Sequence, residues 1–166
     1  YNPFQKDVTD TTVETIDFKE MQGRLAYLCQ TKGIGVFTGR PGVGKTYALR
    51  QFVSSLNPSL YQVVYMPMST LTTIQFYRYL AGSLGLEVGS SKIDNFMNIQ
   101  EYLKRMNSEK RIIPIIILDE AQYLRSEILN DIKLLMNFDM DSKNHCVLIL
   151  AGLPTLVNTL KYNSYE

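Results

Sequence analysis

The chain has 166 residues, of which 45% are hydrophobic and 20% are charged, a composition typical of one globular domain with a substantial core. Seventeen basic and sixteen acidic residues nearly cancel, so no global field favours nucleic acid or an anionic membrane surface. The apolar run at 115–118 is far shorter than the roughly 20 residues of a membrane helix, and no signal-peptide pattern opens the chain. These features predict a cytoplasmic protein and exclude a membrane segment in this sequence.

We expect one domain over residues 1–166, with 1–16 as a lead-in segment. Because the sequence starts without a methionine and stops within a polar stretch, we expect it to be part of a longer protein. Cys29 and Cys146 are too few for a disulfide framework, and together with His145 they cannot form a four-ligand zinc site. Both cysteines are expected to be buried, reduced thiols.

The first predicted helix carries apolar residues at helical spacing over 18–28. Asp17 and Glu20 have the spacing of a capping box, which predicts that this helix starts at Asp17. A short apolar run at 34–37 follows and predicts a strand that is buried on both faces.

A glycine-rich corner comes next, because residues 39–46 read GRPGVGKT and match the pattern G-x-x-x-x-G-K-[ST] ahead of an amphipathic helix. Glycines let the backbone adopt positive φ, so successive N–H groups can point at phosphate oxygens near the positive end of the helix. Lys45 would reach the β- and γ-phosphates, and the Thr46 hydroxyl would join a Mg²⁺ shell. The alternative is a plain turn with an exposed lysine. The motif and its flanking elements favour polyphosphate binding.

The helix that begins near Lys45 is predicted to end at Asn57-Pro58, and a strand follows at 63–66. Thr72 and Gln75 have capping-box spacing ahead of a helical pattern at 76–84. A Gly/Ser-rich loop then leads to another helical pattern at 96–106.

An apolar strand at 115–118 ends in two carboxylates, Asp119 and Glu120. A buried strand can deliver Asp119 to the metal beside Thr46, and Glu120 to a water that faces the γ-phosphate. The alternative is that both acids merely end a strand and start a solvated loop. A carboxylate that activates water favours hydrolysis of a nucleoside triphosphate over phosphate transfer by a small-molecule kinase.

The last predicted elements are a helix at 124–135 and a strand at 147–150. Alternating helices and buried strands predict a three-layer α/β fold with a parallel sheet.

Three segments carry a family resemblance: GRPGVGKT, IIILDEAQ and VLILAGLP resemble AAA+ ATPases of the transposition-helper and ExeA-type secretion branch, which are related to origin-recognition ATPases. By position, 39–46 correspond to the Walker A motif, Asp119 and Glu120 to the Walker B motif, and Gln122 to the glutamine of DEAQ, to which no role is assigned. The opening residues 2–4 resemble the family's lead-in and would lie near the adenine. The expected cofactor-binding residues are Gly39, Arg40, Pro41, Gly42, Val43, Gly44, Lys45, Thr46 and Tyr47. Thr46 and Asp119 are the expected metal ligands, and Glu120 and Lys45 the expected catalytic residues.

The resemblance implies a P-loop NTPase sheet in the order 5-1-4-3-2, with the fifth strand and the helical lid absent from this sequence. It also implies ATP and Mg²⁺ as ligands and self-association into a ring or filament. Within this branch, DNA and a transposase are the expected partners. ATP is the default nucleotide because the guanine-reading N-K-x-D pattern is absent from the sequence.

Two departures from the family pattern concern catalysis. Residues 152–154 read G-L-P where the family commonly has G-Q-P, and the Leu153 side chain cannot orient a water. No arginine follows Arg125, so the sequence lacks the finger arginine that stabilises transition-state charge, worth roughly 10³- to 10⁵-fold in rate. We therefore expect nucleotide binding with very slow hydrolysis.

Three functions remain open: a transposition-helper ATPase, a secretion-assembly ATPase, and a nucleotide-dependent scaffold with little hydrolysis. A basic group at Lys104, Arg105, Lys110 and Arg111 would suit DNA, although such groups are more often simply solvated. The tyrosines at 61, 65, 77, 79 and 102 are expected to serve core or subunit packing rather than base stacking.

Overall fold

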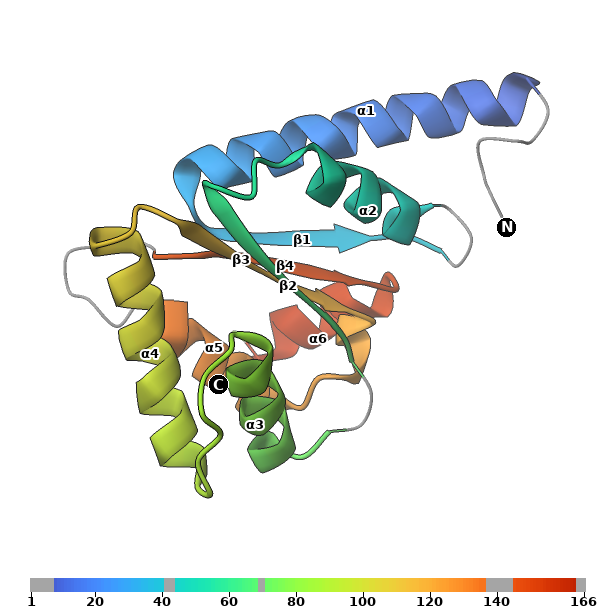
Figure 1. Cartoon of the computed structure of the whole chain (residues 1–166). Coiled ribbons are helices and arrows are strands. Elements are labelled where there is room, and N and C mark those ends of the chain that lie inside the picture. The colour runs from blue at the N-terminus through green and yellow to red at the C-terminus, as the bar shows by residue number, and fades with distance from the viewer. Residues whose placement is uncertain (1–7, 41–43, 69–70, 137–144, 164–166) are drawn as a thin grey trace.

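The computed structural model describes residues 8–40, 44–68, 71–136 and 145–163, and side chains within 19–40, 44–68, 71–135 and 145–160 (Figure 1). The helices are α1 (Val8–Thr31), α2 (Lys45–Ser55), α3 (Thr73–Ser83), α4 (Lys92–Ser108), α5 (Ser126–Met136) and α6 (Thr155–Asn163), with a 3₁₀ turn η2 (Ala121–Tyr123). The strands are β1 (Ile34–Thr38), β2 (Tyr61–Pro67), β3 (Ile113–Asp119) and β4 (Val147–Gly152).

The four strands form one parallel sheet in the order β1-β4-β3-β2. This order confirms the parallel α/β prediction and agrees with the 1-4-3-2 part of the implied sheet. In the described part of the chain, β1 is an edge strand, and no fifth strand lies beside it. Parallel pairing brings all the carboxyl ends of the strands to one edge of the sheet.

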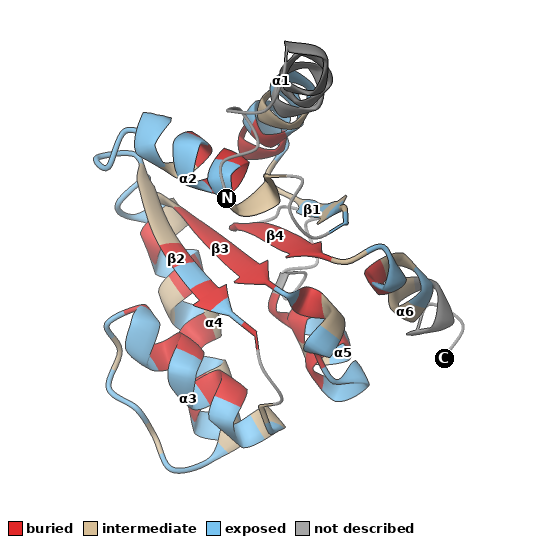
Figure 2. Cartoon of the chain, turned by 90° about the vertical axis from the view of Figure 1, so that its right-hand side faces the viewer, coloured by how far each residue is buried: buried red, intermediate tan, exposed pale blue. Residues whose placement is uncertain are grey.

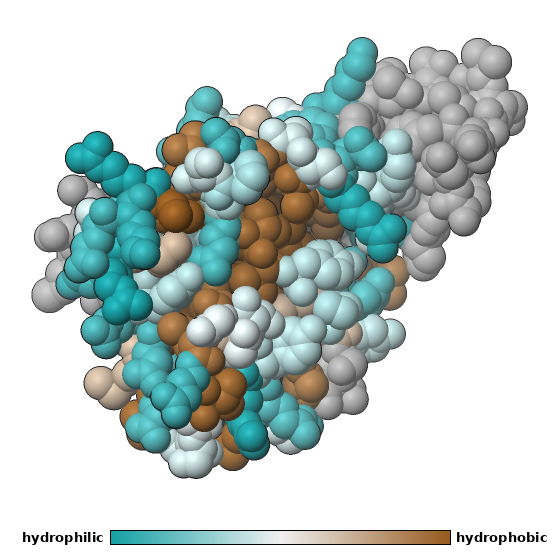
Figure 3. Space-filling model, in the orientation of Figure 1, coloured by the Kyte–Doolittle hydropathy of each residue, from teal (hydrophilic) through white to brown (hydrophobic). Residues whose placement is uncertain are grey.

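Helices cover both faces of the sheet, because alternate residues of each buried strand point to opposite sides. Ile115 and Ile117 pack with α1 and α2, whereas Ile116 and Leu118 pack with α3, α4 and α5. Figure 2 looks onto the carboxyl ends of the strands and shows the two central strands, β3 and β4, as almost entirely buried. Figure 3 shows an apolar band between the two helical layers, on the side where the edge strand β2 faces the viewer.

The structure confirms one predicted helix start and contradicts another. The capping box at Thr72 is confirmed, because Thr72 Oγ1 accepts from the Gln75 N–H at 3.2 Å and Gln75 Oε1 accepts from the Thr72 N–H at 2.9 Å. The predicted start at Asp17 is wrong, since α1 already begins at Val8. Residues 8–17 contain few apolar side chains at helical spacing, so periodicity missed this part of α1, as it missed the short helix α6 after Pro154.

No helix in the described ranges combines the length and apolar character needed to cross a membrane.

Candidate functional site

The described residues of the predicted site lie at the carboxyl edge of the sheet, which faces the viewer in Figure 2. The loop between β1 and α2 starts here, and its Gly39 N–H donates to the Gly152 carbonyl at 3.2 Å. On the other side, the Met68 N–H donates to the Asp119 carbonyl at 2.7 Å. Main-chain bonds therefore join the end of β1 to that of β4, and the end of β2 to that of β3.

Gly44 and Lys45 form the junction between the loop and α2. Gly44 is the N-cap of α2 and has φ +85°, a conformation that glycine adopts without a steric penalty. The Lys45 ammonium donates to the Gly39 carbonyl at 2.6 Å and to the Arg40 carbonyl at 3.5 Å. Burial lowers the pKa of Lys45, while the nearby carboxylates of Glu120 and Asp119 act in the opposite direction. The ammonium thus binds the loop carbonyls and interacts electrostatically with both acids.

The other predicted loop contacts are only partly described. Arg40 is exposed, and Tyr47 is 38% exposed on the first turn of α2. Pro41, Gly42 and Val43 lie outside the described residues, as do the lead-in residues 2–4.

Asp119 and Thr46, the two predicted metal ligands, lie in contact with each other. Asp119 is the last residue of β3 and has the same parity as Ile115 and Ile117, so its side chain points to the face covered by α2. The Thr46 hydroxyl donates to Asp119 Oδ2 at 3.2 Å, and Asp119 is only 4% exposed. Two hard oxygen ligands from different elements therefore converge.

This donor set fits Mg²⁺. The described residues contain no group of three or more His, Cys, Asp or Glu side chains that would form an all-protein metal cage. Mg²⁺ is usually held by one or two protein oxygens together with substrate phosphates and waters. Thr46 and Asp119 beside a glycine-rich loop match that arrangement.

Sequence reasoning missed Tyr65, whose hydroxyl donates to Asp119 Oδ2, while the Glu120 N–H donates to Asp119 Oδ1 at 2.9 Å. Burial, followed by the hydrogen bond to Asp119, raises the pKa of Tyr65 above its usual range. The side chain is 41% exposed, so core packing does not describe its environment, in contrast to the fully buried Tyr77. Period-two alternation along β2 was the available signal, because it places Tyr65 on the α2 face, two residues before Pro67, the partner of Asp119.

Glu120 lies beyond the end of β3 in a left-handed backbone conformation, with φ +55° and ψ +39°. Its carboxylate is exposed and accepts a hydrogen bond from Gln122 Nε2 at 2.6 Å. The Gln122 amide oxygen in turn accepts from the Leu153 N–H at 3.1 Å. The apolar Leu153 side chain cannot orient a water, but the Leu153 main-chain N–H is hydrogen-bonded to Gln122, two residues after Glu120. The sequence did not indicate this bond.

The remaining sequence predictions concern residues away from this edge. Cys29 and Cys146 are buried thiols that form no disulfide, as predicted, and burial raises their pKa values to about 11 and about 12. The basic group is exposed, and it lies at the end of α4 and in the turn before β3, at the amino ends of the strands and thus opposite the site: Lys104, Arg105, Lys110 and Arg111.

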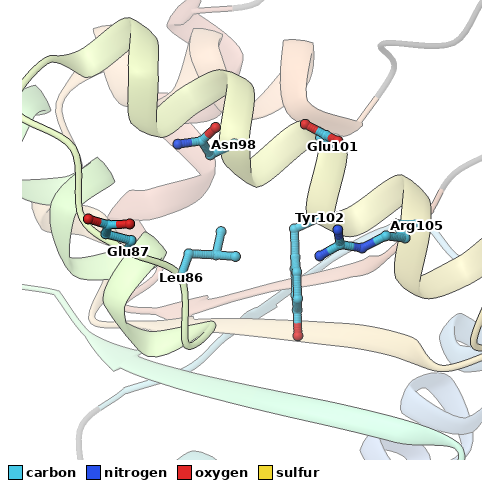
Figure 4. A pocket seen from close by; sticks show the side chains of 6 residues that line it. All are labelled: Leu86, Glu87, Asn98, Glu101, Tyr102 and Arg105. Carbon is cyan, nitrogen blue, oxygen red and sulfur yellow. The ribbon is translucent and has the colours of Figure 1, made fainter.

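A separate pocket of about 210 Å³ lies between α4 and the loop after α3 (Figure 4). Its lining residues are Leu86, Glu87, Asn98, Glu101, Tyr102 and Arg105. The Tyr102 hydroxyl donates to Gln62 on β2 at 2.6 Å. Among the described residues, none of the predicted ATP and metal ligands lines this pocket.

A parallel sheet in this order, with a G-x-x-x-x-G-K-T loop opening α2 and an acidic pair ending β3, defines a P-loop nucleoside triphosphatase fold. Residues 28–160 match the family described as "AAA domain". The chain belongs to this family, which indicates an ATPase of the P-loop kind.

Known proteins resemble the chain in sequence and in structure. The ATP-dependent target DNA activators B of Escherichia phages Mu and D108 are each 27% identical over 123 residues, which cover 74% of the chain and 37% of the phage protein. Cdc6p from Pyrobaculum aerophilum matches with a TM-score of 0.68 at 19% identity, over 88% of this chain and 40% of that one. The Aeropyrum pernix ORC1 protein, solved in complex with DNA, matches with a TM-score of 0.67 at 21% identity, over 90% and 41% of the two chains. The chain thus spans less than half the length of these relatives.

Proposed function

We propose that the chain binds ATP with Mg²⁺ at the loop before α2 and hydrolyses it slowly. The observation that carries this proposal is the convergence of Thr46 and Asp119 beside the Lys45 ammonium. The structure of the Aeropyrum pernix ORC2 protein in ADPNP–ADP complexes, with a TM-score of 0.64 at 16% identity over 100% of this chain and 46% of that one, lends support through its shared fold.

Each residue has a separate role in this proposal. Loop amides and the N-terminus of α2 bind phosphate oxygens, and Lys45 exchanges its bonds to loop carbonyls for bonds to the β- and γ-phosphates. Thr46 and Asp119 would hold Mg²⁺, which neutralises charge on the phosphates. Glu120 orients a water and accepts its proton.

Calorimetry with ATP and Mg²⁺ tests the binding step. The unchanged chain is expected to bind, and Lys45→Ala is expected to lose at least tenfold in affinity because it removes an ammonium that binds the loop and interacts with both carboxylates. Lys19→Ala is the matched control, since Lys19 is exposed on α1. Absence of heat for the unchanged chain, or equal losses in both variants, would refute nucleotide binding at this loop.

For the biological role, we propose an ATP-dependent assembly switch of a DNA-transposition helper, active in the cytoplasm. The sequence similarity to the target DNA activators of phages Mu and D108 supports this role. In this proposal ATP drives self-association into a ring or filament on DNA, and the assembly then engages a transposase. Secretion assembly remains the alternative within the family.

DNA binding by the complete protein distinguishes these roles. Wild type is expected to bind DNA with ATP, and Lys45→Ala is expected to fail at the same ATP concentration. If neither protein binds DNA with any nucleotide, the transposition role is wrong.

A scaffold with little hydrolysis is the second candidate, favoured by the apolar Leu153 side chain directly after β4. Glu120→Gln in the complete protein separates the two. An ATPase loses turnover while it keeps ATP, whereas a scaffold keeps both its nucleotide and its assembly behaviour.

A further inference from the structure

One side chain, Gln122, links Glu120 to the end of β4. Gln122 Nε2 donates to Glu120 Oε2 at 2.6 Å, and Gln122 Oε1 accepts from the Leu153 N–H at 3.1 Å. A carboxylate only accepts and a main-chain N–H only donates, so a single orientation of the amide satisfies both partners. The two bonds therefore fix Gln122, and through it the carboxylate of Glu120.

Gly152 provides the space for this amide. A Cβ atom built on Gly152 would lie 2.4 Å from Gln122 Oε1 and 3.3 Å from the Ala121 nitrogen. The Gly152 carbonyl also accepts from the Gly39 N–H at 3.2 Å, at the start of the loop before α2. One residue at the end of β4 thus contacts both the loop and the side chain that holds Glu120.

We propose that Gln122 is a positioning residue that holds the Glu120 carboxylate in a fixed orientation relative to the loop before α2. This inference rests on the proposed function, because that function assigns to Glu120 the role of orienting a water and accepting its proton. Glu120 is exposed, so without the amide its side chain has several rotamers available, and only some of them suit proton transfer. The Gln122 amide is held by the main-chain N–H of Leu153. Because no side-chain group of residue 153 takes part in this bond, an apolar side chain is compatible with it.

Four substitutions test the proposal. Gln122→Met removes both bonds at similar volume, and Gln122→Glu keeps the acceptor for the Leu153 N–H but replaces the donor to Glu120. Gly152→Ala leaves Gln122 in the chain and displaces its amide. Leu153→Ala is the control, because it leaves the main-chain N–H in place.

Phosphate release under single-turnover conditions, with the protein in excess over ATP, is the first measurement. A general base contributes about 10²- to 10⁴-fold, so a misplaced one is expected to lose about tenfold to a hundredfold. We expect this loss in Gln122→Met, Gln122→Glu and Gly152→Ala with ATP affinity kept, and no loss in Leu153→Ala. The double variant Gln122→Met/Gly152→Ala is expected to lose no more than Gln122→Met alone, because both changes remove the same bonds.

The second measurement is independent of turnover. The side-chain amide resonances of Gln122, assigned by their disappearance in Gln122→Met, are expected to shift in Glu120→Ala and in Gly152→Ala. Unchanged resonances in both variants, or phosphate release by Gln122→Met within twofold of the unchanged chain, overturn the proposal. If the unchanged chain binds no ATP with Mg²⁺, the proposed function is refuted instead, and the resonances still decide whether Gln122 holds Glu120.

Discussion

Replacing Tyr65 with phenylalanine tests the hydrogen bonds that hold Asp119 when no nucleotide is bound. The substitution removes one of three donors to a carboxylate that is 4% exposed, and leaves the Thr46 hydroxyl and the Glu120 N–H. A hydrogen bond to a charged group contributes about 1.5–3 kcal/mol. Because Tyr65 is 41% exposed and water can replace part of the bond, we expect the lower end, about 1.5 kcal/mol.

The assay is chemical denaturation without nucleotide or Mg²⁺, combined in a double-mutant cycle with Asp119→Ala. A loss of about 1.5 kcal/mol corresponds to a fall in Tm of roughly 3–6 °C for a chain of this size. In the Asp119→Ala background, Tyr65→Phe is expected to cost almost nothing, since its partner is gone. Tyr79→Phe, at an exposed position on α3, is the control and should stay within about 0.5 kcal/mol. A coupling energy between Tyr65 and Asp119 below about 0.3 kcal/mol would refute the reasoning.

Three further predictions concern stability and reactivity. Ile117→Ala, at a fully buried position in the central strand β3, is expected to lower the free energy of unfolding by about 3 kcal/mol, whereas the same change at the exposed Ile74 should cost less than about 0.5 kcal/mol; urea denaturation of both compares them. Thr72→Ala removes the cap of α3 and is expected to cost about 1 kcal/mol in the same assay, and an unchanged midpoint would contradict the capping box. The raised pKa values of Cys29 and Cys146 leave both thiols protonated at pH 8, so a disulfide reagent should react with them only after unfolding, and rapid labelling of the native protein would show that the burial is wrong.

The sequence predicted the sheet better than it predicted the ends of the helices. Buried parallel strands are apolar on both faces, so their centres stand out in the sequence. The strands extend beyond the predicted cores by one or two residues at an end, among them the polar Gln62 and Asp119. Helix α1 was missed over residues 8–17, because the sequence there has few apolar residues at helical spacing.

Some residues of the site could also be predicted from the sequence, whereas others could not. Lys45, Thr46 and Asp119 could be brought together from sequence, since a glycine-rich loop and a carboxylate at the end of a parallel strand must share one edge. The hydrogen bonds of Tyr65 and Gln122 within the site could not be predicted in this way. Their bonds depend on strand register and on rotamers that a single sequence does not contain.

The turn after β3 explains how two adjacent acids can have different partners. Asp119 ends the strand with its side chain toward α2, and in a continuing strand Glu120 would point into the opposite helical layer. The left-handed conformation of Glu120, which costs of order 1 kcal/mol or more for a residue other than glycine, instead directs its carboxylate to solvent and to Gln122. The bond from its own N–H to Asp119 Oδ1 and the bond from the Tyr123 N–H to its carbonyl offset that cost. The backbone strain at position 120 therefore separates the carboxylate that would hold the metal from the one that would act on water.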